Sequence, residues 1–342
     1  TCALPISTPR TLDVDMVAPS QPIITAPSSG AWLDTARPAI SWNASTDNFS
    51  GVHKYILSID DDTIELASNV FTYTPVTDLA EGEHDIKLIA EDWATNQSNE
   101  SQRSFSIDLT PPTTPIVIEP SNNTCLRTQI PTFTWQAVSD LYSGVNSLEL
   151  LLDGSAIQSG IAPTATSLIS PVQLDEGNHY WQLRAIDKTG HSASSLAVSF
   201  SIDLTLPTCS ISSLESKPGE FGVYIVNGAA DGMDACGLSL VEVKIDDGEW
   251  ESVTQDPDDE WLAWTYELAA PVEGTYDIQC RSLDGAGNYS DSYLVSADID
   301  QCHETGDCDP DTHICSVKMP DDTSCNNRSE ERRVGKECRS RW

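Results

Sequence analysis

Large apolar residues recur at every second position along much of the chain. Tyr55, Leu57 and Ile59 show this alternation, and residues 241–245 repeat it in the sequence VEVKI. Turn-forming residues interrupt the pattern after roughly every ten positions, and no helical period of three or four residues is present. Because a period of two puts alternate side chains on one face, the pattern predicts short, half-buried β-strands.

The predicted strands are organised in a long repeat. The phrase SFSIDLT occurs at residues 104–110 and again at 199–205, and Asp15, Asp108, Asp203 and Asp300 recur at spacings of 93, 95 and 97 residues. A period near 95 residues is too long for common solenoids and matches an independently folding domain. We therefore predict an end of a preceding module at 8–15, modules at 16–109, 110–204 and 205–300, and a Cys-rich segment at 301–327.

Several short strands in each unit predict an all-β fold of three tandem immunoglobulin-like β-sandwiches. The first unit contains PAISWNASTD, SGVHKYILSIDD and EGEHDIKLIAEDWATN. The second unit has the related sequences PTFTWQAVSD, SGVNSLELLLDG and EGNHYWQLRAIDKTG in the same order. These motifs resemble the bacterial immunoglobulin-like and fibronectin type III-like modules of large surface proteins, over residues 16–300. The resemblance implies the fold but little about function, because such sandwiches host many roles. In the third unit Val226 replaces the strand tryptophan, and three cysteines are present.

Net charge narrows the classes of partner. The chain has 18 basic and 53 acidic residues, a net charge of −35, which repels nucleic acid and acidic membrane surfaces. No apolar run approaches the roughly 20 residues needed to cross a bilayer, so we expect no membrane insertion within this fragment.

The two ends of the chain differ from the rest in character. Residues 1–7 and 328–342 back-translate to sequences that resemble sequencing-library adaptors facing inwards, so we interpret them as artefacts of an unfinished reading frame. Without them the chain keeps 12 basic residues (18 − 6) and 50 acidic ones (53 − 3), a net charge of −38. We therefore read the chain as a fragment.

No motif for catalysis is recognisable. His84 and His179 share one repeat position, filled by Tyr276 in the third unit, where sandwich domains place a corner tyrosine that hydrogen-bonds backbone. His191 aligns with asparagines in the other units. The nucleophile-elbow, zinc-protease, P-loop and dinucleotide signatures are absent from the sequence. We expect no enzyme, no catalytic residue and no organic cofactor.

Aspartates recur where linkers should meet loops of the next module. Three carboxylates at such a joint are the oxygen-rich setting that Ca²⁺ prefers, and the ion would cancel their repulsion. The alternative is that each Asp hydrogen-bonds its own turn and needs no ion. The predicted trios are Asp108, Asp140 and Asp187; Asp203, Asp231 and Asp284; and Asp15, Asp47 and Asp92.

The cysteines indicate an oxidising compartment. Four of them cluster within the segment 301–327, which resembles the start of an EF-hand but lacks its later ligands and shows no zinc spacing. Disulfides suit such a short segment better, which favours an extracellular or cell-surface location. Two cysteines of the third module could bridge its first strand or a loop to its sixth strand, whereas Cys125 is expected to be free. The disulfide candidates are Cys209, Cys236, Cys280, Cys302, Cys308, Cys315 and Cys325.

Tryptophans offer two interpretations. Trp42 and Trp135 fit a buried sandwich core, the alternative being exposed sugar-stacking rings. Trp250, Trp261 and Trp264 surround a long hairpin and could either bind a ligand or cover a core edge.

Prolines in the linkers, as in DLTPPTTP, predict short, stiff connections. Together these features predict a non-catalytic stalk or adhesion region of a large secreted or cell-surface bacterial protein, with an unidentified surface glycan or protein as ligand. The alternatives are accessory binding modules of a secreted polysaccharide- or protein-degrading enzyme, and a protein-binding receptor ectodomain.

Overall fold

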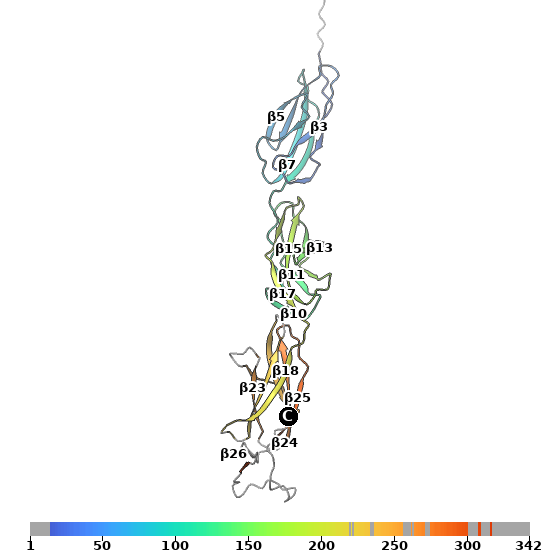
Figure 1. Cartoon of the computed structure of the whole chain (residues 1–342). Helices are drawn as coiled ribbons and strands as arrows, with labels where there is room; N and C mark the ends of the chain where they lie inside the picture. Colours follow the sequence, from blue (N-terminus) through green and yellow to red (C-terminus); the bar gives the residue numbers. More distant parts are fainter. Residues whose placement is uncertain are drawn as a thin grey trace, which may run out of the picture. The chain divides into compact units, whose positions relative to one another are not determined.

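The computed structural model describes most of the chain as β-strands, turns and loops (Figure 1). Within the described residues no helix is long and apolar enough to span a bilayer. The described residues are 14–218, 220, 222–232, 236–255, 261, 263–270, 274–299, 307–308 and 315–316.

The chain divides into two compact units, and the division passes through the second predicted module. The first unit comprises residues up to 119, 132–171 and 181–197, and the second comprises 120–131, 172–180 and 198 onward. The predicted module boundaries themselves stay predictions.

The first sandwich lies wholly in the first unit and has two sheets. The smaller sheet has the order β1 (Ile23–Ala26), β3 (Ile40–Asn43), β6 (Thr72–Tyr73). The larger has the order β2 (Ala31–Leu33), β8 (Ser101–Ile107), β7 (Gly82–Asp92), β4 (Val52–Ile59), β5 (Asp62–Ala67). Strand β2 runs parallel to β8, and β4, β5, β7 and β8 pair antiparallel.

Alternation along these strands produces the core between the two sheets. Tyr55 and Leu57 of β4 and Leu88 of β7 are fully buried, and Trp42 of β3 is 3% exposed. The larger apolar side chains therefore face inwards at every second position, as the sequence predicts. Trp135, the counterpart of Trp42, is 1% exposed, so the sugar-stacking interpretation of these two rings is wrong.

Most of the second sandwich also lies in the first unit. One sheet has the order β14 (Ser167–Ile169), β11 (Thr132–Trp135), β9 (Val117–Glu119). Strand β12 (Val145–Leu152) pairs antiparallel with β13 (Ser155–Ile161) and with β15 (Gly177–Asp187), which also pairs with β16 (Ser192–Ser194).

The second unit holds the remaining strands of that sandwich. Strand β10 (Thr124–Leu126) runs parallel to β17 (Val198–Ile202), and β17 neighbours β15, whose first four residues belong to this unit. The pairing of β10 with β17 repeats that of β2 with β8, so Cys125, opposite Ser201, occupies the position of Trp32, opposite Ser106.

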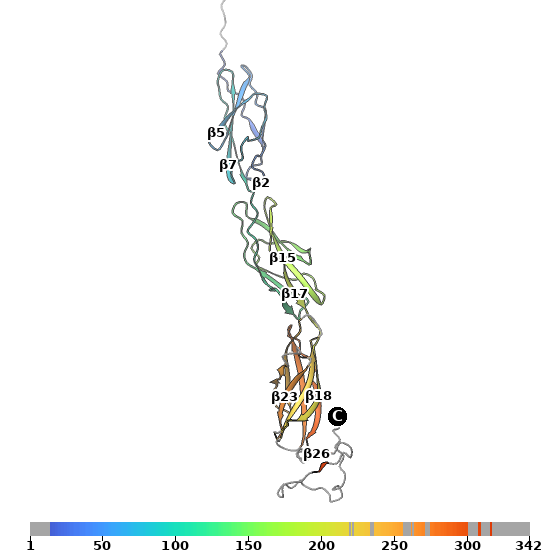
Figure 2. The same ribbon diagram turned by 60° about the vertical axis from the view of Figure 1, so that its left-hand side comes forward.

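The third sandwich lies wholly in the second unit (Figure 2). One sheet has the order β18 (Thr208–Ser216), β19 (Val223–Asp231), β23 (Trp264–Ala269), β22 (Thr254–Gln255). The other has the order β21 (Glu251–Ser252), β20 (Leu238–Ile245), β24 (Gly274–Asp284), β25 (Tyr293–Ile299). With these sheets the predicted all-β fold of tandem sandwiches is confirmed.

A different tryptophan fills the core of the third sandwich. Val226 stands at the position of Trp42 and Trp135, and Trp264 of β23, which is 1% exposed, packs in the same core. Trp264 lies opposite Gly228 in the sheet, and a Cβ at Gly228 would come within 2.1 Å of its ring. Trp261 packs against this core as well, so these two tryptophans belong to the core and its edge.

Two disulfide bonds are present among the described residues. Cys209 of β18 is bonded to Cys280 of β24, one of the pairings that the sequence left open. Cys236 is bonded to Cys125, so the expectation that Cys125 is free is wrong. A single sequence shows Cys125 without a repeat counterpart, and its partner 111 positions away becomes a neighbour only in the folded chain.

The Cys-rich segment contributes one pair of strands. Strand β26 (Asp307–Cys308) pairs antiparallel with β27 (Cys315–Ser316), which places Cys308 opposite Cys315 in the backbone register. Cys302, Cys325 and the two adaptor-like ends, 1–7 and 328–342, lie outside the described residues.

Candidate metal centre at the linkers

Asp15, Asp47 and Asp92, which we call the entry cluster, meet at one end of the first sandwich. Asp15 precedes β1, Asp47 lies in the loop before β4, and Asp92 ends β7. One ligand oxygen from each lies within 4.8 Å of the others. This is the trio predicted from the repeat, and the fold gathers it because the two loops and the linker share one edge of the sandwich.

Backbone donors hold two of these carboxylates in place. Asp15 Oδ1 accepts a hydrogen bond from Val17 N at 2.9 Å, and Asp15 Oδ2 accepts one from Ser50 N at 2.8 Å. Asp47 Oδ2 accepts from the N–H groups of Phe49 and Gly51. Asp47 Oδ1 is buried and has no hydrogen-bond partner. The cluster therefore keeps one buried, unsatisfied carboxylate oxygen.

Asp92 is fully buried, and Asn96 satisfies both of its oxygens. Asn96 N donates to Oδ1 and Asn96 Nδ2 donates to Oδ2, each at 2.8 Å. Burial raises the pKa of Asp92 and the charge of Asp15 adds to that, but the bonds from Asn96 outweigh both and the pKa lies below its ordinary value. Hydrogen bonds from Ser50 and Val17 likewise lower the pKa of Asp15. Asp15 and Asp92 are therefore both anionic at neutral pH.

Asp108, Asp187 and His191 form a second group, which we call the first-joint cluster. Their ligand atoms also lie within 4.8 Å of one another, and Asp108 and Asp187 are buried. Asp108 follows β8 and its Oδ2 accepts a hydrogen bond from Ser143 N at 3.0 Å. Although burial raises the pKa of Asp108, hydrogen bonds from Ser143 and Thr110 lower it below its ordinary value.

The two oxygens of Asp187 have different surroundings. Asp187 Oδ1 accepts hydrogen bonds from the backbone N–H groups of Thr189, Gly190 and His191 at 2.7–2.9 Å. Asp187 Oδ2 is buried without a hydrogen bond and lies 3.4 Å from His191 Nδ1. One oxygen thus forms the loop, and the other remains available beside the imidazole.

Asp140, predicted as the third ligand at this joint, is not part of the first-joint cluster. Asp140 Oδ1 accepts hydrogen bonds from Tyr142 N and Gly144 N, the turn-forming role that Asp47 also has, and Asp140 Oδ2 is buried without a hydrogen bond. His191 takes its place. The signal was present in the sequence, because His191 aligns with Asn96, which contacts Asp92 in the entry cluster.

The third predicted trio is not assembled. Asp284 Oδ1 accepts from Ala286 N and Asn288 N, and Asp284 Oδ2 accepts from Asn288 Nδ2 at 2.8 Å. Asp231 is exposed on β19, opposite Thr208. Among the described residues Asp203, Asp231 and Asp284 therefore form no group of converging ligand atoms, unlike the other two sites.

The donor atoms differ in their fit to a cation. The entry cluster offers only carboxylate oxygens, including the unsatisfied Asp47 Oδ1, and such oxygens are the ligands of Ca²⁺. The first-joint cluster includes an imidazole nitrogen, which a hard cation takes less readily. Of the two clusters, the entry cluster therefore offers the donor set that fits Ca²⁺ better.

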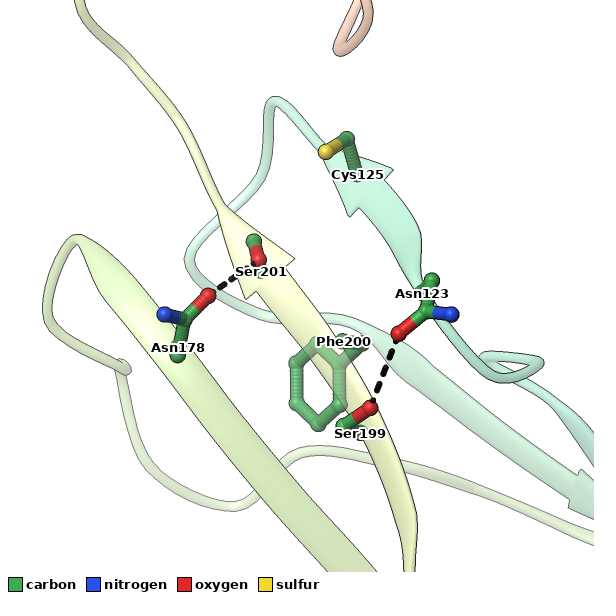
Figure 3. A pocket seen from close by; sticks show the side chains of 6 residues that line it. All are labelled: Asn123, Cys125, Asn178, Ser199, Phe200 and Ser201. Atoms are coloured by element: carbon green, nitrogen blue, oxygen red, sulfur yellow. Dashed lines mark hydrogen bonds between the residues drawn. The ribbon is translucent and has the colours of Figure 1, made fainter. Parts of the chain in front are cut away.

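A polar hollow of about 540 Å³ lies on the second unit, between β10, β17 and the start of β15 (Figure 3). Two pairs form its sides: Ser201 Oγ donates to Asn178 Oδ1 at 2.6 Å, and Ser199 Oγ donates to Asn123 Oδ1 at 3.2 Å. Phe200 and the disulfide-bonded Cys125 complete the lining. Within the part of the chain that the structure describes, no carboxylate, histidine, lysine or arginine lines this hollow.

The predicted corner histidines have a structural role. His84 is buried, and its Nε2 donates to the carbonyl of Ala80 at 2.8 Å. His179 Nε2 donates to the carbonyl of Asp175 at 2.9 Å, the same offset of four residues. The prediction of a polar corner that bonds backbone is confirmed.

The sequence did not predict that Trp250 and Tyr289 both contact Arg281. Arg281 lies 4.3 Å from the ring of Trp250 and 4.5 Å from that of Tyr289, and its guanidinium pairs with Glu242 at 2.8 Å. Trp250 is thus engaged by a cation of its own chain.

Comparison with known proteins identifies no relative by sequence. No family model matches the chain. No curated protein matches it either.

Solved structures do resemble the chain. The fibronectin(III)-like modules of Clostridium thermocellum CbhA match at 18% identity and a TM-score of 0.36, over 53% of this chain and 94% of that one. A solved chain from a 1.5-MDa bacterial ice-binding adhesin matches at 14% identity and a TM-score of 0.36, over 81% of this chain and 95% of the solved one. A tetra-tandem repeat from the extending region of a large adhesion protein matches at 16% and 0.30, over 83% and 75%.

Proposed function

We propose that the chain is a non-catalytic stalk or adhesion region of a secreted or cell-surface protein whose linkers bind Ca²⁺. The observation that carries the proposal is the entry cluster, where a linker carboxylate meets two loop carboxylates and Asp47 Oδ1 is buried without a partner. A stalk needs each sandwich to be tied to the chain that precedes it, and the linker aspartates make those ties.

The hydrogen bonds at the linkers support this role. Asp15 Oδ2 and Asp108 Oδ2 each accept from the backbone N–H of a serine in the next loop, Ser50 and Ser143. The same contact recurs at both positions because the repeat places the same residues there. Hydrogen bonds alone orient the linker, and a cation would add the attraction that offsets the repulsion among the carboxylates.

The disulfide bonds support a location outside the reducing cytosol. Cys209–Cys280 and Cys125–Cys236 both lie in the second unit, and such bonds persist in oxidising compartments. The strongly acidic composition suits a soluble spacer. The proposed ligand of the whole protein is a surface glycan or a protein.

Calcium titration during thermal unfolding tests the proposal. A ligand that binds only the native state raises its stability by about 2.7 kcal/mol at a hundred times its dissociation constant, or several degrees for a domain of this size. We expect millimolar Ca²⁺ to raise the melting temperature of the first sandwich. Asp47→Asn should abolish most of that rise, since it removes the charge at the unsatisfied oxygen.

A matched control is Asp61→Asn, an exposed aspartate in the turn between β4 and β5. This variant should respond to Ca²⁺ as the unmodified chain does. A melting temperature that millimolar Ca²⁺ leaves unchanged would remove calcium from the proposal.

A further inference from the structure

We propose that the Cys125–Cys236 disulfide is a covalent lock on the second joint, the linker that follows β17 and contains Asp203. It takes the place that carboxylate clusters hold at the two preceding linkers, and reduction releases it. The inference concerns a different linker from the calcium sites and does not depend on them. All of its residues belong to the second compact unit.

The two cysteines come from opposite sides of this joint. Cys125 lies in β10 of the second sandwich, the parallel partner of β17. Cys236 lies in the loop before β20 of the third sandwich. Their Cα atoms are 6.0 Å apart although 111 positions separate them in sequence. The bond therefore joins the end of one sandwich to a loop of the next.

The repeat shows that Cys236 occupies a contact position. It directly precedes Gly237, as Ser50 precedes Gly51 and Ser143 precedes Gly144. Ser50 and Ser143 are the residues whose N–H groups bind the linker carboxylates. At the second joint the side chain at this same position makes a covalent bond to Cys125.

Two hydrogen bonds near the disulfide also cross the second joint. Arg127 Nη1, one residue beyond β10, donates to the carbonyl of Gly287 at 2.9 Å. Asn288 Nδ2 donates to the carbonyl of Asp203 at 3.0 Å. Gly287 and Asn288 belong to one loop, which lies beside Cys236. The disulfide therefore acts together with hydrogen bonds that also cross the joint.

Gly285 makes room for the loop that carries Cys236. A Cβ at this position would lie 2.5 Å from the carbonyl oxygen of Cys236, a backbone atom that cannot move cheaply. The equivalent residues in the other sandwiches are Trp93 and Lys188, which have large side chains. The equivalent loops also meet in the first sandwich, where Trp93 N donates to the carbonyl of Gly51 at 3.3 Å, as Gly285 N donates to that of Gly237 at 2.9 Å. At the second joint the absent side chain of Gly285 leaves room for the Cys236 carbonyl.

The cation cluster is lost at the same joint. Among the described residues Asp203, Asp231 and Asp284 do not converge. The entry and first-joint clusters have no cysteine at the matching loop position, which is serine in both. Thus one joint has a disulfide without the acidic cluster, and two have the cluster without a disulfide.

Release of the lock is a two-electron reduction. A dithiol reductant attacks one sulfur, the S–S bond breaks, and Cys125 and Cys236 each gain one hydrogen as thiols while the reductant becomes a cyclic disulfide. In an oxidising space the joint stays fixed, and in contact with a dithiol it becomes mobile.

Amide hydrogen exchange of the full chain tests the lock. In the double variant Cys125→Ser/Cys236→Ser, we expect exchange at residues 124–127, 203–207 and 284–288 to rise by about ten-fold or more. The control is Cys209→Ala/Cys280→Ala, which removes the disulfide inside the third sandwich and should leave exchange at residues 124–127 of the second sandwich unchanged. Residues 108–113 of the first linker should be unchanged in the lock variant.

Mild reduction of the folded, unmodified chain provides the same test without a substitution. It guards against a variant that fails to fold, because the chain folds before the bond is broken. Unchanged exchange at the second joint after both treatments would overturn the lock. So would titration of Cys125 as a free thiol in the non-reduced protein. Neither outcome bears on calcium binding, which is read at the first sandwich.

Discussion

Gly228 and Trp264 show how the core can be filled by a side chain from a different strand. The first two sandwiches place a tryptophan on the second core strand, and the third has Val226 there. Trp264 enters from β23 and lies opposite Gly228, where the missing side chain leaves room for the indole ring. A core needs its volume filled, but the filling residue can come from any strand that faces it.

Substitution of Gly228 tests this packing. A Cβ would meet the Trp264 ring at 2.1 Å and the Ser210 carbonyl oxygen at 2.3 Å, so Gly228→Ala should lower the free energy of unfolding of the third sandwich by about 2–3 kcal/mol. Gly274→Ala, which meets nothing within 4 Å, is the control and should stay within about 0.5 kcal/mol. Equal denaturant midpoints for the two variants would contradict the packing.

At the scale of elements, the three sandwiches have different residues at one equivalent cross-strand pair, which lies between β4 and β7 in the first sandwich, β12 and β15 in the second, and β20 and β24 in the third. Glu149 on β12 lies opposite Arg184 on β15, and Glu242 on β20 lies opposite Arg281 on β24. The first sandwich has Ile56 opposite Ile89 at this position. The same register thus accepts an ion pair or an apolar pair, because both fill the outer face of the sheet.

Substitution of the Glu149–Arg184 ion pair tests how much it contributes to the free energy of unfolding of the second sandwich. Hydrogen bonds from Ser159 and Arg184 lower the pKa of Glu149, although burial raises it. Arg184→Met should therefore reduce the free energy of unfolding at pH 7 by about 1 kcal/mol, a small value because Arg184 is partly exposed. The double variant Glu149→Ile/Arg184→Ile, which copies the first sandwich, should restore stability.

The effect of Arg184→Met should depend on pH. Since the folded pKa of Glu149 is depressed, its contribution is present above the ordinary Glu pKa of about 4.3 and is lost as the pH falls through the folded value. Denaturation at pH 7 and at a series of lower pH values would show this, with the two proteins converging as the pH falls. A loss of equal size at every pH would exclude the ion pair as its cause.

At the scale of the whole chain, the first and third sandwiches have cores of their own, and the disulfide bonds among the described residues lie in the second unit. Core residues of the first sandwich and of the third form separate clusters. Cys209–Cys280 closes 71 positions within the third sandwich, and Cys125–Cys236 reaches from the second to the third. We therefore expect the sandwiches to unfold in separate transitions.

Calorimetry of Cys209→Ala/Cys280→Ala tests this expectation. Loss of a bond across 71 positions should destabilise the third sandwich by roughly 2–5 kcal/mol. The transition of the first sandwich should stay at its original temperature, because none of its core residues contacts this bond. A shift of the whole unfolding curve as one transition would contradict independent cores.

The sequence by itself determined the class of fold, because the information is local. Alternation at 55–59 and 241–245 specifies strands, the repeated Asp108 and Asp203 specify the period, and both arise from neighbouring residues. The entry cluster also followed from the repeat, since its members hold fixed places in each unit. The corner role of His84 and His179 was recognisable for the same reason.

Tertiary structure decided the features that depend on distant contacts. The partner of Cys125 and the replacement of the strand tryptophan by Trp264 each join residues far apart in sequence. The physical reason is that these choices are made by which atoms come within a few ångströms after folding, and no periodic pattern records that.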